Sequence, residues 1–306
     1  MPELPDITVY VEALRRRVEG RVLEKVRVHS PSLLRTFDPP LEAAEGLRIA
    51  GVDRLGKRVV LLTEGGPALV VHLMIAGRLR WNPGGRPGLK RGRIDMAAFA
   101  FDTGTLTLTE ASTVKRATLH CVRPEGLGAF RPGGLDVLTC TPEGFAAVMR
   151  GATRTLKRAL TDPRVLDGIG NAYSDEILHA ARLSPTQRTS NLSEDELRGL
   201  HAAAVGTLLR WTGELLREFG LNDPAAPGRF PGPGEVTAFR PGFAVHGRYQ
   251  RPCPACGASV QRIVYAENEC NYCPVCQTGG RLLADRSLSR LLKDDWPRTV
   301  EELEGS

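Results

Sequence analysis

A chain of 306 residues is long enough for two modest domains and a small appendage. With 42% hydrophobic and 25% charged residues, the composition indicates a globular protein, and because no apolar run reaches about 18 residues we expect no membrane span. Residues 1–6 lack the basic and apolar stretches of a secretory signal, so we expect a cytoplasmic protein. The net charge of +6 suits a polyanionic partner such as a phosphate backbone.

The N-terminal third of the sequence combines one helix with several strands. Apolar residues at the helical period follow Pro5 and stop before Gly20, which predicts one early helix. The pattern then becomes extended, and turn clusters separate the strand-like segments. These segments are residues 58–63, 68–73, 96–101 and 105–109. Short strands at such spacing predict an antiparallel β-sandwich, which we place at residues 1–135.

The middle of the chain has a helical pattern. Thr141 and Pro142 predict one helix start, and Ser193 and Glu196 form a capping box that predicts another. A Pro/Gly-rich stretch follows and predicts a flexible loop. We therefore expect a helical domain, a loop, a cysteine module and a C-terminal tail whose leucines suit a helix packed on that module. Their boundaries are 136–222, 223–240, 241–280 and 281–306.

Five of the seven cysteines fall within the 24 residues that end at Cys276. In a reducing compartment such crowding indicates a metal site rather than disulfides or unrelated buried thiols. Cys270 also has CxxC spacing with Cys273, but only the outer pairs carry proline after their first cysteine. We therefore predict one structural Zn²⁺ per chain, with Cys270 outside the site, because four thiolates leave no open position for chemistry. The expected ligands are Cys253, Cys256, Cys273 and Cys276.

Pro2 becomes the N-terminal residue if Met1 is removed, as generally happens before a small residue. Its secondary amine would then be a nucleophile toward an aldehyde-like carbon. The positive end of the helix that begins at Pro5 disfavours protonation of that amine, and Glu3 lies within reach as a general acid or base. Most prolines at this position have no catalytic role, so these residues alone leave both interpretations open.

Four segments together resemble the Fpg/Nei family of base-excision DNA glycosylases (formamidopyrimidine-DNA glycosylase and endonuclease VIII). In the family's order they are residues 1–6 (MPELPD), 55–58 (LGKR), 168–176 (GIGNAYSDE) and the two cysteine pairs; residues 241–249 (PGFAVHGRY) also match. The resemblance covers nearly the whole chain. It implies an α+β multidomain fold, with an N-terminal antiparallel β-sandwich carrying an early helix, a helix–two-turn–helix domain and a C-terminal zinc ribbon.

The resemblance also implies a bifunctional DNA glycosylase and AP lyase. Pro2 would form a Schiff base at C1′ of the damaged nucleotide, Glu3 would protonate the opening sugar, and Lys57 would hold the phosphate or sugar and assist β-elimination. Asn171, at a glycine-rich helix start, would cap that helix or bind a DNA phosphate, helped by Lys157. The implied partner is damaged double-stranded DNA, without a membrane or a nucleotide cofactor. We expect a monomer that is nucleoid-associated when bound to DNA.

Two departures from the family pattern concern the contacts with DNA. The family fills the gap left by the flipped base with a methionine and an Arg-Arg-Phe-Gly loop. Here Met74 lies one position early, with Ile75 at the expected site, and residues 115–118 (KRAT) lack the phenylalanine; Met74 and Arg116 are therefore the candidates. Asn268 replaces the arginine that the family places before the third zinc ligand, so the resemblance does not extend to δ-elimination or to the preferred lesion.

Substitutes for that arginine are Arg262, or Arg281 and Arg286 in the tail. Two alternative functions also remain open from the sequence. One is an AP lyase with weak or atypical glycosylase activity, because the gap-filling residues differ. The other is a non-catalytic, structure-specific DNA-binding protein. The joint presence of Pro2, Glu3 and Lys57 argues against this alternative.

Overall fold

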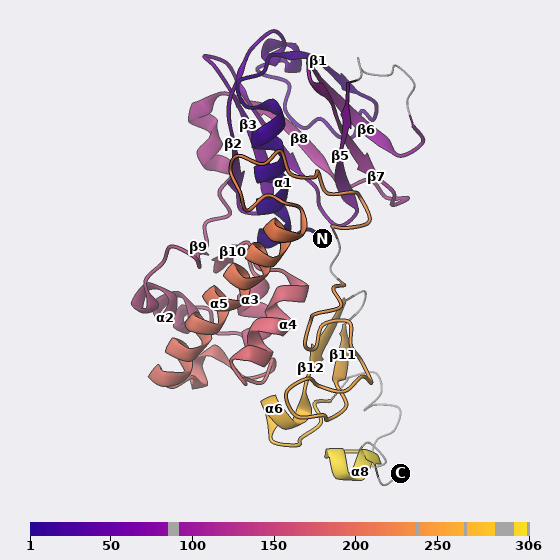
Figure 1. Ribbon diagram of the computed structural model, residues 1–306. Coiled ribbons are helices and arrows are strands. Elements are labelled where there is room, and N and C mark those ends of the chain that lie inside the picture. The colour runs from indigo at the N-terminus through magenta and orange to yellow at the C-terminus, as the bar shows by residue number, and fades with distance from the viewer. Residues whose placement is uncertain (85–91, 237–238, 266–267, 285–296, 305–306) are drawn as a thin grey trace. The chain divides into compact units, whose positions relative to one another are not determined.

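The computed structural model describes residues 1–84, 92–236, 239–265, 268–284 and 297–304 (Figure 1). The chain divides into two compact units. Unit 1 consists of Met1–Pro132 with Arg210–Ala238, and unit 2 consists of Gly133–Leu209 with Phe239–Ser306. A search of the described helices finds none with the length and apolar character that crossing a bilayer requires.

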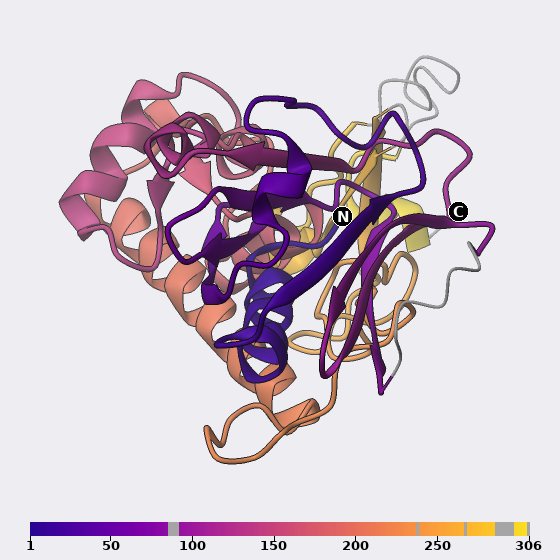
Figure 2. The ribbon, with the colours of Figure 1, turned by 90° about the horizontal axis from the view of Figure 1, so that it is seen from above.

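Unit 1 contains two four-stranded antiparallel sheets and the helix α1 (Leu4–Val18). One sheet has the order β1 (Leu23–Val28), β6 (Asp95–Phe101), β7 (Gly104–Glu110), β5 (Gly77–Pro83), and Figure 2 shows its strands side by side. The other has the order β2 (Ile49–Leu55), β3 (Arg58–Thr63), β4 (Ala68–His72), β8 (Thr118–Val122). Two short 3-10 helices are η1 (Leu41–Ala44) and η2 (Pro124–Phe130). The predicted antiparallel β-sandwich is thus confirmed.

The two sheets and α1 enclose one apolar core. Leu14 of α1, Phe99 of β6 and Leu69 of β4 are fully buried in it, and each such side chain contributes ~1.5–3 kcal/mol relative to exposure. The helix begins where the sequence predicts because a capping box forms. The Glu3 side chain accepts from the backbone of Asp6, and Asp6 Oδ2 accepts from Glu3 N at 2.8 Å.

The helix α5 (Glu194–Glu218) starts in unit 2 and ends in unit 1. Its last turns lie beside α1 (Figure 1), where Leu215 and Phe219 pack against Val9 and Ala13. This differs from the predicted boundary, which assigned the whole helix to the helical domain. The sequence pattern shows that the helix has an apolar face. It does not show that the first part of this face belongs to unit 2 and the last part packs against α1 in unit 1.

The Pro/Gly-rich stretch after α5 has no helix or strand in residues 222–236, as predicted, but it is not a free spacer. Arg16 donates to the carbonyls of Leu221, at 2.5 Å, and of Ala226. Arg17 donates to Gly228 O at 2.8 Å, and its guanidinium lies 5.4 Å from the centre of the Phe230 ring. Two arginines of α1 therefore anchor the loop that composition alone describes as flexible.

Unit 2 joins a helical region to a ribbon-like module. Its helices are α2 (Pro142–Gly151), α3 (Leu156–Thr161), α4 (Asn171–Ala180), the first part of α5, η3 (Thr189–Asn191), α6 (Pro274–Thr278) and α8 (Val300–Glu304). A parallel pair, β9 (Leu135–Asp136) and β10 (Leu166–Asp167), and an antiparallel pair, β11 (Gln261–Tyr265) and β12 (Asn268–Tyr272), complete it.

Both predicted helix starts in unit 2 are confirmed. Thr141 caps α2 by accepting from Gly144 N at 3.1 Å, and Ser193 exchanges backbone and side-chain hydrogen bonds with Glu196 at 2.8 and 3.1 Å. In the tail, Leu283 N donates to the Tyr272 hydroxyl at 2.8 Å. The leucines of the expected tail helix at 288, 291 and 292, and Arg286, lie outside the described residues.

Candidate active site and metal centre

The N-terminus of unit 1 lies at the first turn of α1, with Pro2 and Glu3 both buried. Burial lowers the pKa of the Met1 amine below its ordinary value; Glu3 opposes this shift, and Arg78 and Lys57 add to it. The positive end of a helix acts in the same direction on a nearby cation. The start of the chain is therefore a place where an amine loses its proton more readily than in water.

Lys57 lies in the two-residue turn that joins β2 to β3. Gly56 precedes it with φ +61°, the left-handed conformation that such hairpin turns require. The lysine is half-buried, and its charge acts on the N-terminal amine and on His72. The structure thus brings Lys57, which is far from Pro2 and Glu3 in the sequence, into the same electrostatic environment as these two residues.

Two further charged or titratable residues share this environment and were missed by the sequence reasoning. Arg78 is one of the cations that lower the pKa of the amine. The pKa of His72 falls to about 4, first through burial and then through Arg58 and Lys57, so this ring is neutral at physiological pH. Both are ordinary strand residues in the sequence pattern, and only the packing of the sheets reveals their position.

The turn between β4 and β5 exposes an apolar side chain. Met74 has φ +52°, a strained conformation for a residue with a side chain, and is half-buried. Ile75, next to it, is 54% exposed. Gly77 closes the turn by donating to Leu73 O at 2.8 Å, and a Cβ at Gly77 would lie only 2.2 Å from that oxygen. The turn therefore presents Ile75 to solvent more fully than the predicted Met74.

Arg116, the other predicted gap-filling residue, lies in the segment between β7 and β8 of the same unit. Its side chain is exposed, but its backbone is held: Arg116 N donates to both carboxylate oxygens of Glu110 at 3.0 Å. The structure thus combines an exposed cationic side chain with a fixed backbone position.

In unit 2, the glycine-rich segment before α4 forms the predicted helix start. Gly168 has φ +85°, and Gly170 is the N-cap, so Asn171 is the first helical residue rather than the cap. One N–H of its side-chain amide donates to Glu269 O at 2.9 Å. Asn171 is half-buried at the positive end of a ten-residue helix, a suitable position for binding an anion.

Lys157 has a different environment from the predicted one. It is only 8% exposed, and its ammonium group donates to Asn171 O at 2.6 Å, Ser174 Oγ at 2.8 Å and Asp175 Oδ1 at 2.5 Å. Three acceptors use all three N–H groups, so in this structure Lys157 supports the helix that bears Asn171 and is not available to a phosphate.

Asp175 and Glu176 connect α4 to the ribbon-like module. Besides Lys157, Asp175 accepts from His246 Nδ1 at 2.7 Å and from Asn271 N at 3.1 Å. The Glu176 carboxylate accepts three backbone N–H groups, those of residues 244–246, at 2.7 to 2.9 Å. These two buried carboxylates thus fix segments of the module on the helix.

Asn268, at the start of β12, is exposed. Arg262, proposed as a substitute for the missing family arginine, is already engaged by the module itself. Its guanidinium lies 3.2 Å from Glu269 Oε2 and 4.3 Å from the centre of the Tyr249 ring. Arg281 is exposed and pairs through its backbone with Thr299.

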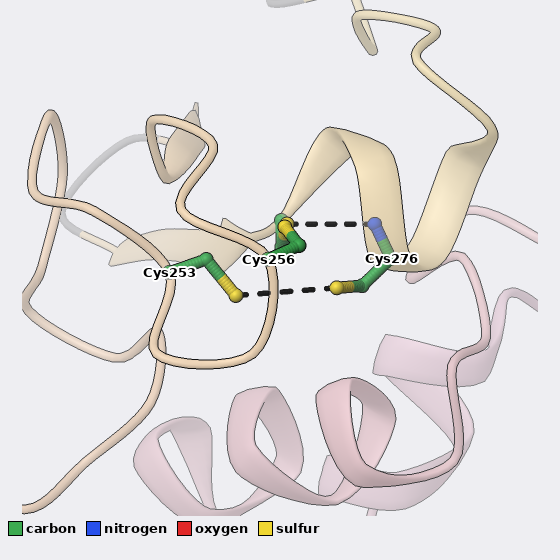
Figure 3. A group of neighbouring side chains, drawn as sticks. Cys253, Cys256 and Cys276 are labelled. Atoms are coloured by element: carbon green, nitrogen blue, oxygen red, sulfur yellow. Dashed lines mark hydrogen bonds between the residues drawn. The ribbon is translucent and has the colours of Figure 1, made fainter.

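Four thiols converge in the module as predicted. The sulfur atoms of Cys253, Cys256, Cys273 and Cys276 all lie within 4.8 Å of one another. Figure 3 shows the sulfurs of Cys253 and Cys276 facing each other, 4.0 Å apart; those of Cys256 and Cys273 are 3.4 Å apart. Cys270 is buried in β12 outside this group.

The sequence of the chain matches two family models: the formamidopyrimidine-DNA glycosylase N-terminal domain at residues 1–116 and the formamidopyrimidine-DNA glycosylase H2TH domain at residues 137–211. A formamidopyrimidine-DNA glycosylase of Thermus thermophilus is 34% identical over 292 residues, covering 92% of this chain and 100% of that protein. An uncharacterized formamidopyrimidine-DNA glycosylase-like protein of Mycobacterium tuberculosis is 40% identical over 171 residues, 56% of this chain and 97% of that protein.

Solved structures share the fold. A complex between the Lactococcus lactis Fpg and an abasic site containing DNA has a TM-score of 0.76 at 22% identity, covering 90% of this chain and 99% of that one. MutM in complex with carbocyclic 8-oxo-G containing DNA has a TM-score of 0.76 at 23% identity, covering 90% and 100%. With the match to the Thermus enzyme over nearly its full length, these findings establish that the chain belongs to the Fpg/Nei family of DNA glycosylases.

Proposed function

We propose that the protein is a bifunctional DNA glycosylase and AP lyase that uses the amine of Pro2 after removal of Met1. The observation that carries this proposal is the environment of the N-terminus, where burial lowers the pKa of the terminal amine beside Glu3, Arg78 and Lys57. A lowered pKa favours the neutral form of the amine, which can attack an electrophilic carbon without first losing a proton to solvent.

The proposed reaction begins with a bond between the amine nitrogen and C1′ of the damaged nucleotide. The base leaves with the proton of the amine. The C1′–O4′ bond of the sugar ring then breaks, O4′ takes up a proton, and an iminium between the amine nitrogen and C1′ remains. Loss of a proton from C2′ then breaks the C3′–O bond, the phosphate leaves and the strand is nicked; water finally releases the amine. The buried Glu3 carboxyl is suited to move the proton at the sugar, and Lys57 to pair with a phosphate next to the lesion.

The proposed partner is damaged double-stranded DNA. Support comes from the family, from the net charge of +6, and from solved complexes of similar fold that contain DNA with an abasic site or 8-oxo-G. Asn171, at the start of α4, binds a phosphate, and Lys157 supports Asn171 by donating to its backbone carbonyl. The turn of Met74 and Ile75, with Arg116, occupies the space of the flipped nucleotide, and Asn268 is a further contact.

A structural Zn²⁺ completes the proposal. In a tetrahedral site with Zn–S bonds of about 2.3 Å, neighbouring sulfurs lie roughly 3.8 Å apart. The sulfur separations of 3.4 and 4.0 Å bracket that value, and all four thiols fit within 4.8 Å. The residues present therefore fit zinc, which would join the two ends of the module without taking part in the reaction.

Borohydride trapping on a duplex with one abasic site tests the lyase chemistry. We expect a covalent adduct that peptide mass spectrometry places on Pro2 of a chain lacking Met1, and much slower trapping for Pro2→Gly, whose primary amine is less suited to form an iminium. Absence of an adduct, or an adduct on Lys57, would refute the assignment. Excision from a panel of oxidised bases then separates a glycosylase from an AP lyase with weak base excision, the alternative that the altered gap-filling residues favour.

A further inference from the structure

The strand β7 ends at Glu110, whose side chain is only 1% exposed. Its carboxylate accepts two backbone N–H groups: that of Arg116, shared between both oxygens at 3.0 Å, and that of Ala117 through Oε2 at 3.1 Å. The ammonium group of Lys115 also donates to the carbonyl oxygen of Glu110. One residue thus closes the loop of residues 111–116 from both its side chain and its backbone.

Glu110 also pairs with the end of the turn between β4 and β5, which carries Ile75. In the pairing of β5 with β7, Glu110 lies directly opposite Gly77. Gly77 is the residue whose close approach to Leu73 O closes the turn that exposes Ile75. Glu110 therefore connects the backbone of the turn that carries Ile75 to the backbone of the loop that carries Arg116.

We propose that Glu110 is a positioning residue that holds the Ile75 turn and the Arg116 loop together as one unit for insertion into the DNA at the site of the flipped nucleotide. This inference rests on the proposed function. A buried carboxylate that accepts backbone N–H groups fixes a loop without occupying its exposed side chains. Ile75 and Arg116, which Glu110 leaves free to meet DNA, supply an apolar side chain and a hydrogen-bond donor from two different connections of the sandwich.

The substitution Glu110→Gln tests this role with almost no change in volume. It replaces one acceptor oxygen by an NH₂ group, which must then face a backbone N–H donor. The matched control is Glu45→Gln in the same unit, because Glu45 also accepts a backbone N–H, from Val26 at 2.9 Å, and pairs with Lys25 at 2.8 Å, but these partners lie on β1, at the edge of the sheet opposite β5. Circular dichroism and the melting temperature show whether each variant is folded.

The assay uses a duplex in which 2-aminopurine lies opposite an abasic analogue. The fluorescence of 2-aminopurine rises when this base is unstacked from its neighbours. At saturating protein, we expect the rise to fall by at least half for Glu110→Gln and to stay unchanged for Glu45→Gln. Single-turnover borohydride trapping, measured on the same duplex with a natural abasic site in place of the analogue, should slow about tenfold, as for the loss of one buried polar contact. A purely structural role would lower the melting temperature but leave the fluorescence amplitude at saturation intact.

Coupling to Arg116 gives the second criterion. Because Glu110 acts partly by positioning Arg116, the amplitude lost by the double variant with Arg116→Ala should be smaller than the sum of the two single losses. An unchanged amplitude in Glu110→Gln, or full additivity in the double variant, would overturn the proposal. A wild-type protein that gives the fluorescence rise without trapping would refute the lyase function and leave this inference standing. A wild-type protein that is trapped without a fluorescence rise would support the lyase function and refute this inference.

Discussion

Replacing Asp175 by asparagine should destabilise unit 2 by several kcal/mol. Asp175 is fully buried and accepts from Lys157 at 2.5 Å, His246 at 2.7 Å and Asn271 at 3.1 Å. An asparagine oxygen can serve only one side of this arrangement, and its NH₂ group must face a donor. Lys157 then stays buried without a countercharge, and breaking a buried pair in this way costs about 3–5 kcal/mol.

The matched control is Asp102→Asn. Asp102 also pairs with an arginine, Arg21, at 3.2 Å, but each side chain in this pair is 51% exposed. Exposed pairs contribute ~0.2–1 kcal/mol, so this variant should unfold almost like the wild type. Urea unfolding, followed by circular dichroism, measures the free energy of unfolding of both variants. A loss below about 1 kcal/mol for Asp175→Asn would refute the reasoning, since it would mean that the buried ammonium needs no partner.

The pH dependence supplies an independent check. Burial alone would raise the pKa of Asp175, but Lys157 and His246 outweigh it and hold the pKa below its ordinary value. A carboxyl with a lowered folded pKa stabilises the protein above its unfolded pKa of about 3.9 and loses this contribution as the pH falls through the folded value. The difference between wild type and Asp175→Asn should therefore be complete at neutral pH and shrink below about pH 4.

Three further predictions concern the metal centre and the N-terminal site. Cys273→Ser should lower the zinc content from about one ion per chain to near zero by elemental analysis, whereas Cys270→Ser should keep it; equal loss in both would place Cys270 in the site. Arg78→Gln should move the acidic limb of the pH–rate profile for trapping to higher pH, because the arginine lowers the pKa of the N-terminal amine; an unmoved limb would contradict this. Gly77→Ala should cost ~1–3 kcal/mol by thermal unfolding, since its Cβ would lie 2.2 Å from Leu73 O, and a neutral effect would show that the turn opens freely.

Local patterns in the sequence determined much of the fold. Strand β3 has the predicted bounds of residues 58–63, α2 begins after its Thr141 cap, and four thiols at CxxC spacing converge while Cys270 stays outside. Each of these features depends on side-chain period, on a cap within three or four residues, or on a short turn. Such interactions join near neighbours, so the sequence contains them almost completely.

The tertiary structure alone decided which polar groups are occupied. The sequence pattern predicts that Lys157 is available to bind DNA, but in the structure it pairs with Asp175, 18 residues away. Asp175 also pairs with His246, which lies 71 residues further along the chain. Likewise, nothing in the pattern around Glu110 indicates that β7 ends opposite Gly77. These partners meet only when distant segments pack, and burial then makes each unpaired donor or charge costly enough to fix the arrangement.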